Sequence, residues 1–378
     1  MVNRNPNQNS QARQSLANQF DDQEMQFSRA FALIEDGIAA HAFPAASLAV
    51  THRGALVALR GFGRFTYDPA SSEVQADTVF DLASVTKVMA TTAVAMILYD
   101  RKRLQLDSSV ADLLPDFVAL GPPAQAAERR TVTIRMLLSH SSGLPAYVKL
   151  FETTHSREEL FRAACATPFV EPPGSKAEYS DIGFILLGEI LARLANEPLD
   201  VFTHREIFAP LEMNHTCFNP PTELRETIPP TEDDRTFRHR IIQGEVNDEN
   251  ASVMNCVSGH AGLFAPAADV ARFAKCMLRS GSPIFQPATV ELFTRRETNP
   301  VGTSRALGWD TPSEPSTSGK YFSQRSFGHL GFTGTSLWID PERQLSVTFL
   351  SNRVWPDRSS RAIRQVWPAL HDAIVEAL

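Results

Sequence analysis

The sequence predicts an α/β protein in which one α/β domain, built from both chain ends, carries an inserted and mostly helical domain. Strand-hairpin signatures occur near both ends of the chain, and a long middle stretch is helical and loop-like with proline-rich joints. We therefore expect a discontinuous α/β domain over residues 24–90 and 254–378, and the inserted helical domain over residues 91–253.

The N-terminal part of the chain divides into a polar segment and a structured one. Residues 1–23 are rich in Asn, Gln, Ser and Asp and lack the apolar core of a secretory signal, which predicts a flexible polar arm. As written, this predicts a cytoplasmic protein; a periplasmic or secreted protein is the alternative if an export signal was trimmed. Apolar residues repeating from Phe27 to Ile38 then predict an amphipathic helix over residues 24–40.

Two hairpins and a series of helices follow. Apolar runs at 46–50 and 55–59 flank Arg53-Gly54, and those at 335–339 and 345–350 flank Asp340-Pro341-Glu342, so each pair predicts an antiparallel hairpin. Residues 310–320 predict a surface loop. Helical patterns cover the segments 92–100, 158–166, 182–195 and 359–378, the last with an expected kink at Pro368.

Composition excludes several classes of protein. The 378 residues are 43% hydrophobic and 21% charged, which is ordinary globular composition, and the net charge of -7 opposes nucleic-acid binding. No apolar stretch approaches the ~20 residues of a membrane helix. The four cysteines lie far apart and are expected to be buried thiols.

The sharpest local feature is Ser84, followed three residues later by Lys87 and an apolar helical run. The spacing places both side chains on one helical face. A lysine in the first turn of a helix is electrostatically unfavourable, whereas an amine beside a serine can take or relay the proton of its hydroxyl. A helix start there would also offer N–H groups to an oxyanion. The alternative is an N-cap serine followed by a solvated lysine.

Two further segments carry candidate site residues. Tyr179-Ser180-Asp181 precedes an apolar helix, where the tyrosine hydroxyl could face a cleft, although an amphipathic core tyrosine is the default. Gly328-His329-Leu330-Gly331 lies in a strand-like context, which indicates either a close backbone approach or a glycine bulge.

Ser84-x-x-Lys87, Tyr179-x-Asp181 and His329-x-Gly331, in this order, resemble the three motifs of the penicillin-recognising serine hydrolases. This family includes class C β-lactamases, D-Ala-D-Ala carboxypeptidases and β-lactamase-like esterases. The resemblance covers residue 27 to the C-terminus and implies a β-lactamase/transpeptidase-like fold, with an antiparallel sheet flanked by helices.

The resemblance also implies roles for these residues. Ser84 is acylated, Lys87 and Tyr179 relay its proton, and the N–H groups of Ser84 and Phe332 form the oxyanion hole. Asp181, His329 and Gly331 support substrate binding. A protonated Lys87 beside Tyr179 is expected to lower the pKa of the phenol and so create a base usable near neutrality.

Two positions depart from the family pattern. Asp181 stands where the peptidases and β-lactamases have Asn, and an ionised carboxylate is expected to pair with Lys87 and hold it protonated. His329-Leu330 replaces a Lys-Thr pair that binds a substrate carboxylate. His329 is expected to be mostly neutral at pH 7, and Leu330 lacks a hydroxyl, so carboxylate recognition is weakened.

Both departures favour a carboxylesterase on short-to-medium acyl esters with weak or no β-lactamase activity. A D-Ala-D-Ala carboxypeptidase or class C-like β-lactamase is the alternative, and a non-catalytic ligand-binding or scaffold domain is the alternative from another class.

The remaining motifs predict no cofactor and no metal. Gly61-Phe62-Gly63 lacks a dinucleotide fingerprint, and the histidines show no ligand spacing. His140 and His260 are expected to form structural hydrogen bonds. The expected partner is a small ester, amide or β-lactam substrate, with no nucleic acid and no membrane span; the oligomeric state stays open.

Overall fold

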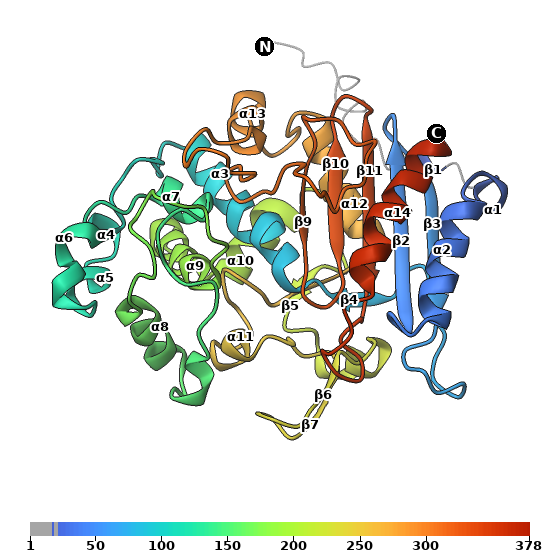
Figure 1. The fold of residues 1–378 in the computed structure, drawn as a ribbon, viewed down its shortest axis with the longest axis horizontal. Coiled ribbons are helices and arrows are strands. Elements are labelled where there is room, and N and C mark those ends of the chain that lie inside the picture. The colour runs from blue at the N-terminus through green and yellow to red at the C-terminus, as the bar shows by residue number, and fades with distance from the viewer. Residues whose placement is uncertain (1–16, 19–21) are drawn as a thin grey trace, which may run out of the picture.

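A sheet of six strands forms the centre of one half of the molecule in a computed structural model, which describes residues 17–18 and 22–378 (Figure 1). The strand order is β1-β3-β2-β11-β10-β9, with β1 parallel to β3 and the other pairs antiparallel. The strands are β1 (Ala17–Asn18), β2 (Ala45–His52), β3 (Ala55–Gly63), β9 (Phe327–Leu330), β10 (Ser336–Asp340) and β11 (Leu345–Ser351). Both expected hairpins are confirmed, and the β2–β11 pairing joins the two chain ends.

The turn between β2 and β3 shows why the first hairpin forms. Arg53 and Gly54 have φ angles of 49° and 83°, the left-handed pair that a two-residue hairpin loop requires. Glycine adopts this conformation without the steric penalty that a side chain brings.

The first helical segment is divided into two helices, so the prediction of a single helix over residues 24–40 is wrong. The structure has α1 (Gln23–Gln26) and α2 (Ser28–Ala39), with Phe27 between them at φ −103° and ψ 19°. The Phe27 side chain is fully buried, and the break lets the Gln23 side chain accept a hydrogen bond from the N–H of Leu59 in β3. The polar arm expected over 1–23 lies outside the described residues apart from β1, Asp22 and Gln23.

Helices cover both faces of the sheet (Figure 1). Helices α2 and α14 (Ile363–Glu376) pack on one face against Leu48 and Val50, whereas α12 (Ala267–Leu278) packs on the other against Ala49. The alternation follows from the two-residue period of a strand. Helix α14 begins at Ile363 rather than at residue 359 and has Pro368 inside it.

The other half of the molecule is mostly helical (Figure 1). Its helices, with α13 beside α3, are α3 (Ala93–Asp100), α4 (Val110–Leu113), α5 (Asp116–Ala119), α6 (Ala126–Arg129), α7 (Ile134–Leu138), α8 (Arg157–Ala166), α9 (Asp181–Ala195), α10 (Leu199–Thr203), α11 (Glu249–Val253) and α13 (Pro287–Thr294). Two small sheets lie beside them, formed by β4 (Val79–Asp81), β8 (Leu263–Pro266) and β5 (Cys217–Phe218), and by β6 (Glu232–Asp234) and β7 (Arg240–Ile242). The helices expected at 92–100, 158–166 and 182–195 are confirmed as α3, α8 and α9.

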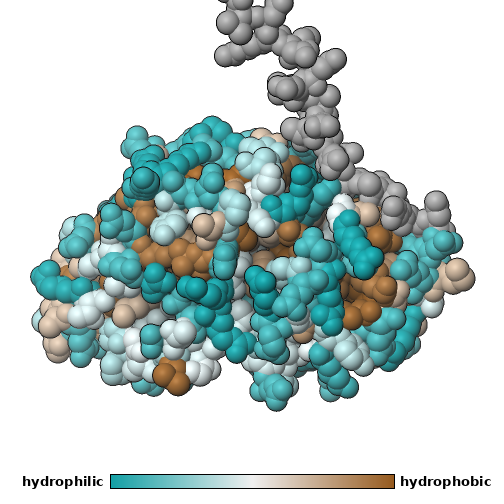
Figure 2. All heavy atoms as spheres, turned by 90° about the horizontal axis from the view of Figure 1, so that it is seen from above, coloured by the Kyte–Doolittle hydropathy of each residue, from teal (hydrophilic) through white to brown (hydrophobic). Residues whose placement is uncertain are grey.

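The surface is mixed in character. Figure 2 shows hydrophobic residues gathered in separate patches between hydrophilic ones on one face of the molecule. Among residues 17–18 and 22–378, no helix has both the length and the apolar character needed to cross a membrane.

Residues 310–320 form the expected loop, although Thr311 and Ser318 within it are buried. All four cysteines are free thiols; Cys165 and Cys276 are buried and the other two are half-buried.

Asn352, which follows β11, ties three segments together and gives a test of this packing. Its side-chain oxygen accepts the N–H of Ala45 at 3.1 Å, and its amide donates to the carbonyls of Phe65 and Pro230 at 2.9 and 2.8 Å. Asn352→Ala leaves buried backbone groups without partners, so we expect the free energy of unfolding in urea to fall by about 3 kcal/mol. Gln26→Ala, which removes one exposed hydrogen bond to the oxygen of Ala377, is the control, with an expected loss of under about 0.5 kcal/mol. Equal losses in both variants would contradict the assignment.

Candidate active site

The turn that carries Ser84 follows strand β4. Residues Ala83–Val85 form a 3-10 turn, Lys87–Thr92 continue as a π-helical segment, and α-helix begins only with α3. The helix start expected at Ser84 and Lys87 is confirmed, with 3-10 and π-helical geometry in place of a regular α-helix. Because Ala83 has a φ of 45°, the chain bends sharply just before Ser84.

Two hydrogen-bond donors converge on the hydroxyl oxygen of Ser84. The Nζ of Lys87 donates to it at 3.0 Å, and the hydroxyl of Tyr179 donates to it at 2.7 Å. Tyr179 and Ser180 directly precede α9. The hydroxyl oxygen of Ser180 accepts the N–H of Gly183 and so caps the helix, which fixes the position of Tyr179. The structure therefore brings together the three residues that the sequence motifs single out.

Lys87 is a completely buried cation. Its Nζ forms an ion pair with Oδ1 of Asp181 at 2.6 Å and donates a hydrogen bond to the main-chain oxygen of His260 at 2.9 Å. Burial by itself lowers the pKa of Lys87, but Asp181 and Tyr179 more than offset this, so the pKa lies above the ordinary value of a lysine. The expected pairing of Asp181 with Lys87 is confirmed, and the raised pKa favours the protonated amine.

The pKa of Tyr179 differs from the expectation. Burial, followed by the charge of Asp181, raises it to about 12, and the opposing contributions of Lys87 and Ser84 are smaller. The prediction of a lowered pKa is wrong, because the sequence showed the nearby cation but not the loss of solvent around the phenol. At neutral pH, Tyr179 is a neutral phenol that donates its proton toward Ser84.

The turn after β9 is attached directly to the segment that precedes Ser84. The hydroxyls of Thr333 and Thr335 donate to the main-chain oxygens of Asp81 and Leu82 at 2.7 and 2.9 Å. A Cβ on Gly331 would lie 2.5 Å from the oxygen of Leu82, so only glycine permits this approach. The close backbone approach expected at this motif is confirmed.

Phe332 lies in this same turn. Its N–H forms no hydrogen bond with any residue that the structure describes, and its side chain is partly exposed. The amide next to the Ser84 turn is thus an available donor, as an oxyanion hole requires.

His329 is neutral, as expected. Burial lowers its pKa to about 3, with Lys87 and Arg305 adding to the effect. Its Nδ1 lies 2.8 Å from the main-chain oxygen of Leu330, and its ring centroid lies 6.0 Å from that of Tyr179. It supplies no positive charge to a substrate carboxylate.

His140 and His260 form hydrogen bonds within the protein, as expected. Nδ1 of His140 accepts the N–H of Ser180 at 3.1 Å, and its ring centroid lies 4.7 Å from that of Tyr179. Nε2 of His260 lies 2.8 Å from Oδ1 of Asp248. Neither ring forms a hydrogen bond to Ser84 in the described structure.

Arg305, in the long loop before β9, is a site residue that none of the sequence motifs indicates. Its guanidinium carbon lies 5.5 Å from the centroid of the Tyr179 ring, and its nearest carboxylate contact is to Asp310 at 3.8 Å. The side chain forms no hydrogen bond among the described residues and, with Lys176, lines a hollow of about 290 Å³. No local spacing in the sequence marks this arginine.

A larger cavity of about 780 Å³ is lined by none of these site residues, but two of its lining residues, Tyr147 and Arg358, lie next to segments that contact them. Tyr147 lies in its wall and donates to Glu249 at 3.3 Å, and the N–H of Asp181 bonds the oxygen of the residue before Tyr147. Arg358 forms an ion pair with Glu249 at 2.9 Å and lies 5.4 Å from the ring centroid of Phe332. The cavity wall is therefore charged and aromatic rather than purely aliphatic.

Comparisons with known proteins agree with this geometry. A family model described as Beta-lactamase matches residues 30–369. A Bacillus subtilis (strain 168) protein named N-acetylmuramyl-L-alanine amidase is 33% identical over 358 residues, covering 85% of this chain and 79% of the relative. An Escherichia coli (strain K12) protein, provisionally named D-alanyl-D-alanine carboxypeptidase, is 32% identical over 303 residues, which cover 73% of this chain and 69% of the relative.

A solved structure titled "EstCE1, a hydrolase with promiscuous acyltransferase activity" matches with a TM-score of 0.76 at 20% identity, covering 93% of this chain and 99% of that one. The likeness confirms the β-lactamase/transpeptidase-like fold.

The buried ion pair gives a test that needs no substrate. Asp181→Asn removes the charge that raises the pKa of Lys87, so the Lys87 side chain is expected to titrate at least about one pH unit lower. NMR titration of lysines labelled at Cε measures this directly. Glu178→Gln, which removes the partner of exposed Lys176, is the control and should shift that lysine far less because water screens the pair. Unchanged titration of Lys87 in Asp181→Asn would contradict the assignment.

Proposed function

The chain belongs to the β-lactamase family of serine hydrolases, and from this premise we propose that it hydrolyses carboxylic esters through an acyl-Ser84 intermediate. The observation that carries the proposal is the convergence of Lys87 and Tyr179 on the Ser84 oxygen. A serine hydroxyl held by two proton-relay groups is suited to nucleophilic attack on a carbonyl carbon.

The reaction has two steps. Ser84 Oγ bonds to the ester carbonyl carbon and the bond to the leaving alcohol breaks. The neutral Tyr179 hydroxyl takes the serine proton as it passes its own proton to the alcohol, while Lys87 stays protonated. Water then attacks the acyl-serine, releasing the acid and returning a proton to Ser84. The N–H groups of Ser84 and Phe332 stabilise the oxyanion in both steps.

Neutral esters are the preferred substrates in this proposal. His329 is uncharged and Leu330 has no hydroxyl, so this strand lacks the groups that would bind the carboxylate of a β-lactam. We therefore assign short-to-medium acyl esters as substrates, with slow turnover of β-lactams.

Arg305 favours a second candidate, the hydrolysis of an amide in a substrate with a free carboxylate. Its guanidinium has hydrogen-bond donors to spare beside Tyr179 and can bind a carboxylate through two parallel bonds. The names of the two relatives, an amidase and a carboxypeptidase, support this candidate.

Replacing the nucleophile tests the proposal. Ser84→Ala is expected to lower the initial rates on p-nitrophenyl acetate, butyrate and octanoate by about 10³-fold or more, because no other group forms the acyl intermediate. Nitrocefin turnover, measured in parallel, is expected to be slow in the wild type. Intact-mass analysis should detect an acyl adduct in the wild type only. Ser139→Ala, at a serine beside His140, is the matched control and should keep full activity. A wild type inert on esters and amides would favour the non-catalytic alternative.

Arg305→Ala separates the two candidates. With an N-acetylated dipeptide as substrate, the loss of the guanidinium is expected to raise KM about tenfold or more, while KM for the same peptide with a C-terminal amide stays unchanged. Arg305→Lys should retain part of the effect, since it keeps the charge but not the fork. If neither peptide is hydrolysed while esters are, the amide candidate is wrong.

A further inference from the structure

Asp81, the last residue of β4, has a buried carboxylate that no step of the proposed reaction uses. Only 2% of the residue is exposed. Its Oδ1 accepts the N–H of Ala83 at 2.8 Å, and its Oδ2 accepts the N–H of Asn247 at 2.7 Å. Each carboxylate oxygen therefore holds a different segment of backbone.

The first of these contacts acts on the turn that presents the nucleophile. Ala83 has a φ of 45°, a left-handed conformation in which a Cβ lies too close to the following carbonyl oxygen. The hydrogen bond from its N–H to Asp81 favours this conformation, and Ser84 comes next in the chain.

The main chain of Asp81 fixes the opposite side of the site. Its carbonyl oxygen accepts the hydroxyl of Thr333 at 2.7 Å, and Thr333 follows Phe332 directly. One residue is thus bonded both to the turn that carries Ser84 and to the turn that carries the second oxyanion donor.

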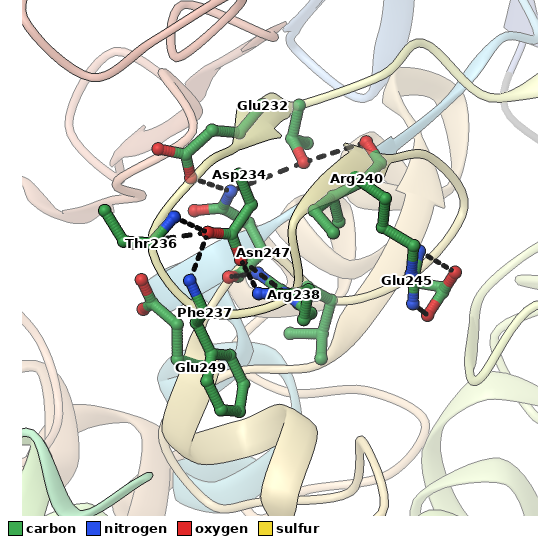
Figure 3. Close-up of polar contacts among 12 residues, drawn as sticks. Glu232, Asp234, Thr236, Phe237, Arg238, Arg240, Glu245, Asn247 and Glu249 are labelled. Atoms are coloured by element: carbon green, nitrogen blue, oxygen red, sulfur yellow. Dashed lines mark hydrogen bonds and ion pairs between the residues drawn. The ribbon is translucent and has the colours of Figure 1, made fainter. Parts of the chain in front are cut away.

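The remaining contact anchors Asp81 to the polar network shown in Figure 3. Asn247 donates its side-chain amide to Glu232 at 3.0 Å, and Arg238 donates to the carbonyl of Asn247 and to the carboxylate of Asp234. This network holds the Asn247 backbone in place. The Asp81 carboxylate therefore connects the network to the Ser84 turn.

We infer that Asp81 is a positioning residue whose ionised carboxylate keeps Ser84 and the Phe332 amide in catalytic register, so that its protonation turns the enzyme down. The inference rests on the proposed function and concerns the regulation of the same site. Protonation places a hydrogen on a carboxylate oxygen that faces a backbone N–H, so one of the two contacts becomes donor against donor and is lost.

The surroundings of Asp81 place this switch in a mildly acidic range. Burial, together with the nearby charge of Asp248, raises its pKa to about 6, while the N–H bonds of Asn247 and Ala83 and the charge of Arg238 oppose the shift. The half-buried thiol of Cys256 also lies close enough to sense the charge of Asp81. Because the active form is the carboxylate, kcat is expected to fall as the pH drops through about 6.

Asp81→Asn tests the inference, because the amide keeps the shape of the carboxylate but turns one acceptor into a donor. At pH 7.5 we expect kcat on p-nitrophenyl butyrate to fall roughly 10- to 100-fold, corresponding to one buried N–H left unpaired, with KM changed less than about twofold. The acid limb of the wild-type profile near pH 6 should be absent in the variant.

Two further variants separate positioning from simple loss of stability. Asp269→Asn alters a buried carboxylate of α12, which accepts the N–H of His215 at 2.9 Å and the hydroxyl of Thr216 at 3.0 Å and belongs neither to the Asn247 network nor to the Ser84 turn. It is expected to lower the melting temperature and leave kcat and its pH profile unchanged. Adding Ala83→Gly to Asp81→Asn should recover part of kcat, because glycine adopts the left-handed conformation without the hydrogen bond.

The outcomes are distinct. Wild-type kcat in Asp81→Asn, an acid limb that persists in it, or an equal loss in Asp269→Asn would overturn the inference while leaving Ser84-dependent hydrolysis intact. A wild type whose activity does not depend on Ser84 would overturn both the proposed function and this inference.

Discussion

The burial of the Lys87 ammonium is the constraint on which the rest of the site depends. A charge removed completely from water is costly, by several kcal/mol, unless partners surround it. Its partners come from three separate parts of the chain: Asp181 at the start of α9, the main-chain oxygen of His260 before β8, and the Ser84 turn after β4. The fold therefore has to hold these three segments at fixed distances from one another.

Close backbone packing makes this possible. A Cβ on Gly188 in α9 would lie 2.7 Å from the Cα of Gly259, and the hydroxyl of Thr91 bonds the oxygen of Gly259 at 2.6 Å. Strands β4 and β8 pair antiparallel beside this contact. The helix that carries Asp181 and the segment that carries His260 thus meet with no side chain between them, and Lys87 fits the space that remains.

The sequence could predict those features of the arrangement that follow from local residue patterns. The hairpins follow from turn residues such as Arg53-Gly54, and the order of Ser84, Lys87 and Tyr179 identifies the chemistry. The Asp181–Lys87 pair also followed from residue type alone. The direction of the Tyr179 pKa shift could not be predicted from the sequence. It depends on how completely the fold removes water from the phenol and on whether Asp181 or Lys87 has the larger effect on it.

Long-range contacts account for the other failures. The break at Phe27 serves the docking of α1 on β3, and Arg305 reaches Tyr179 from a loop with no motif of its own. The motif residues and Arg305 contribute differently to the charge of the site. Lys87 and Asp181 neutralise each other and His329 is uncharged, so the motif residues leave little net charge for a substrate to encounter. The positive charge beside the Tyr179 ring is instead that of Arg305, so the electrostatic character of the site depends on a loop outside the motifs as well as on the motif residues.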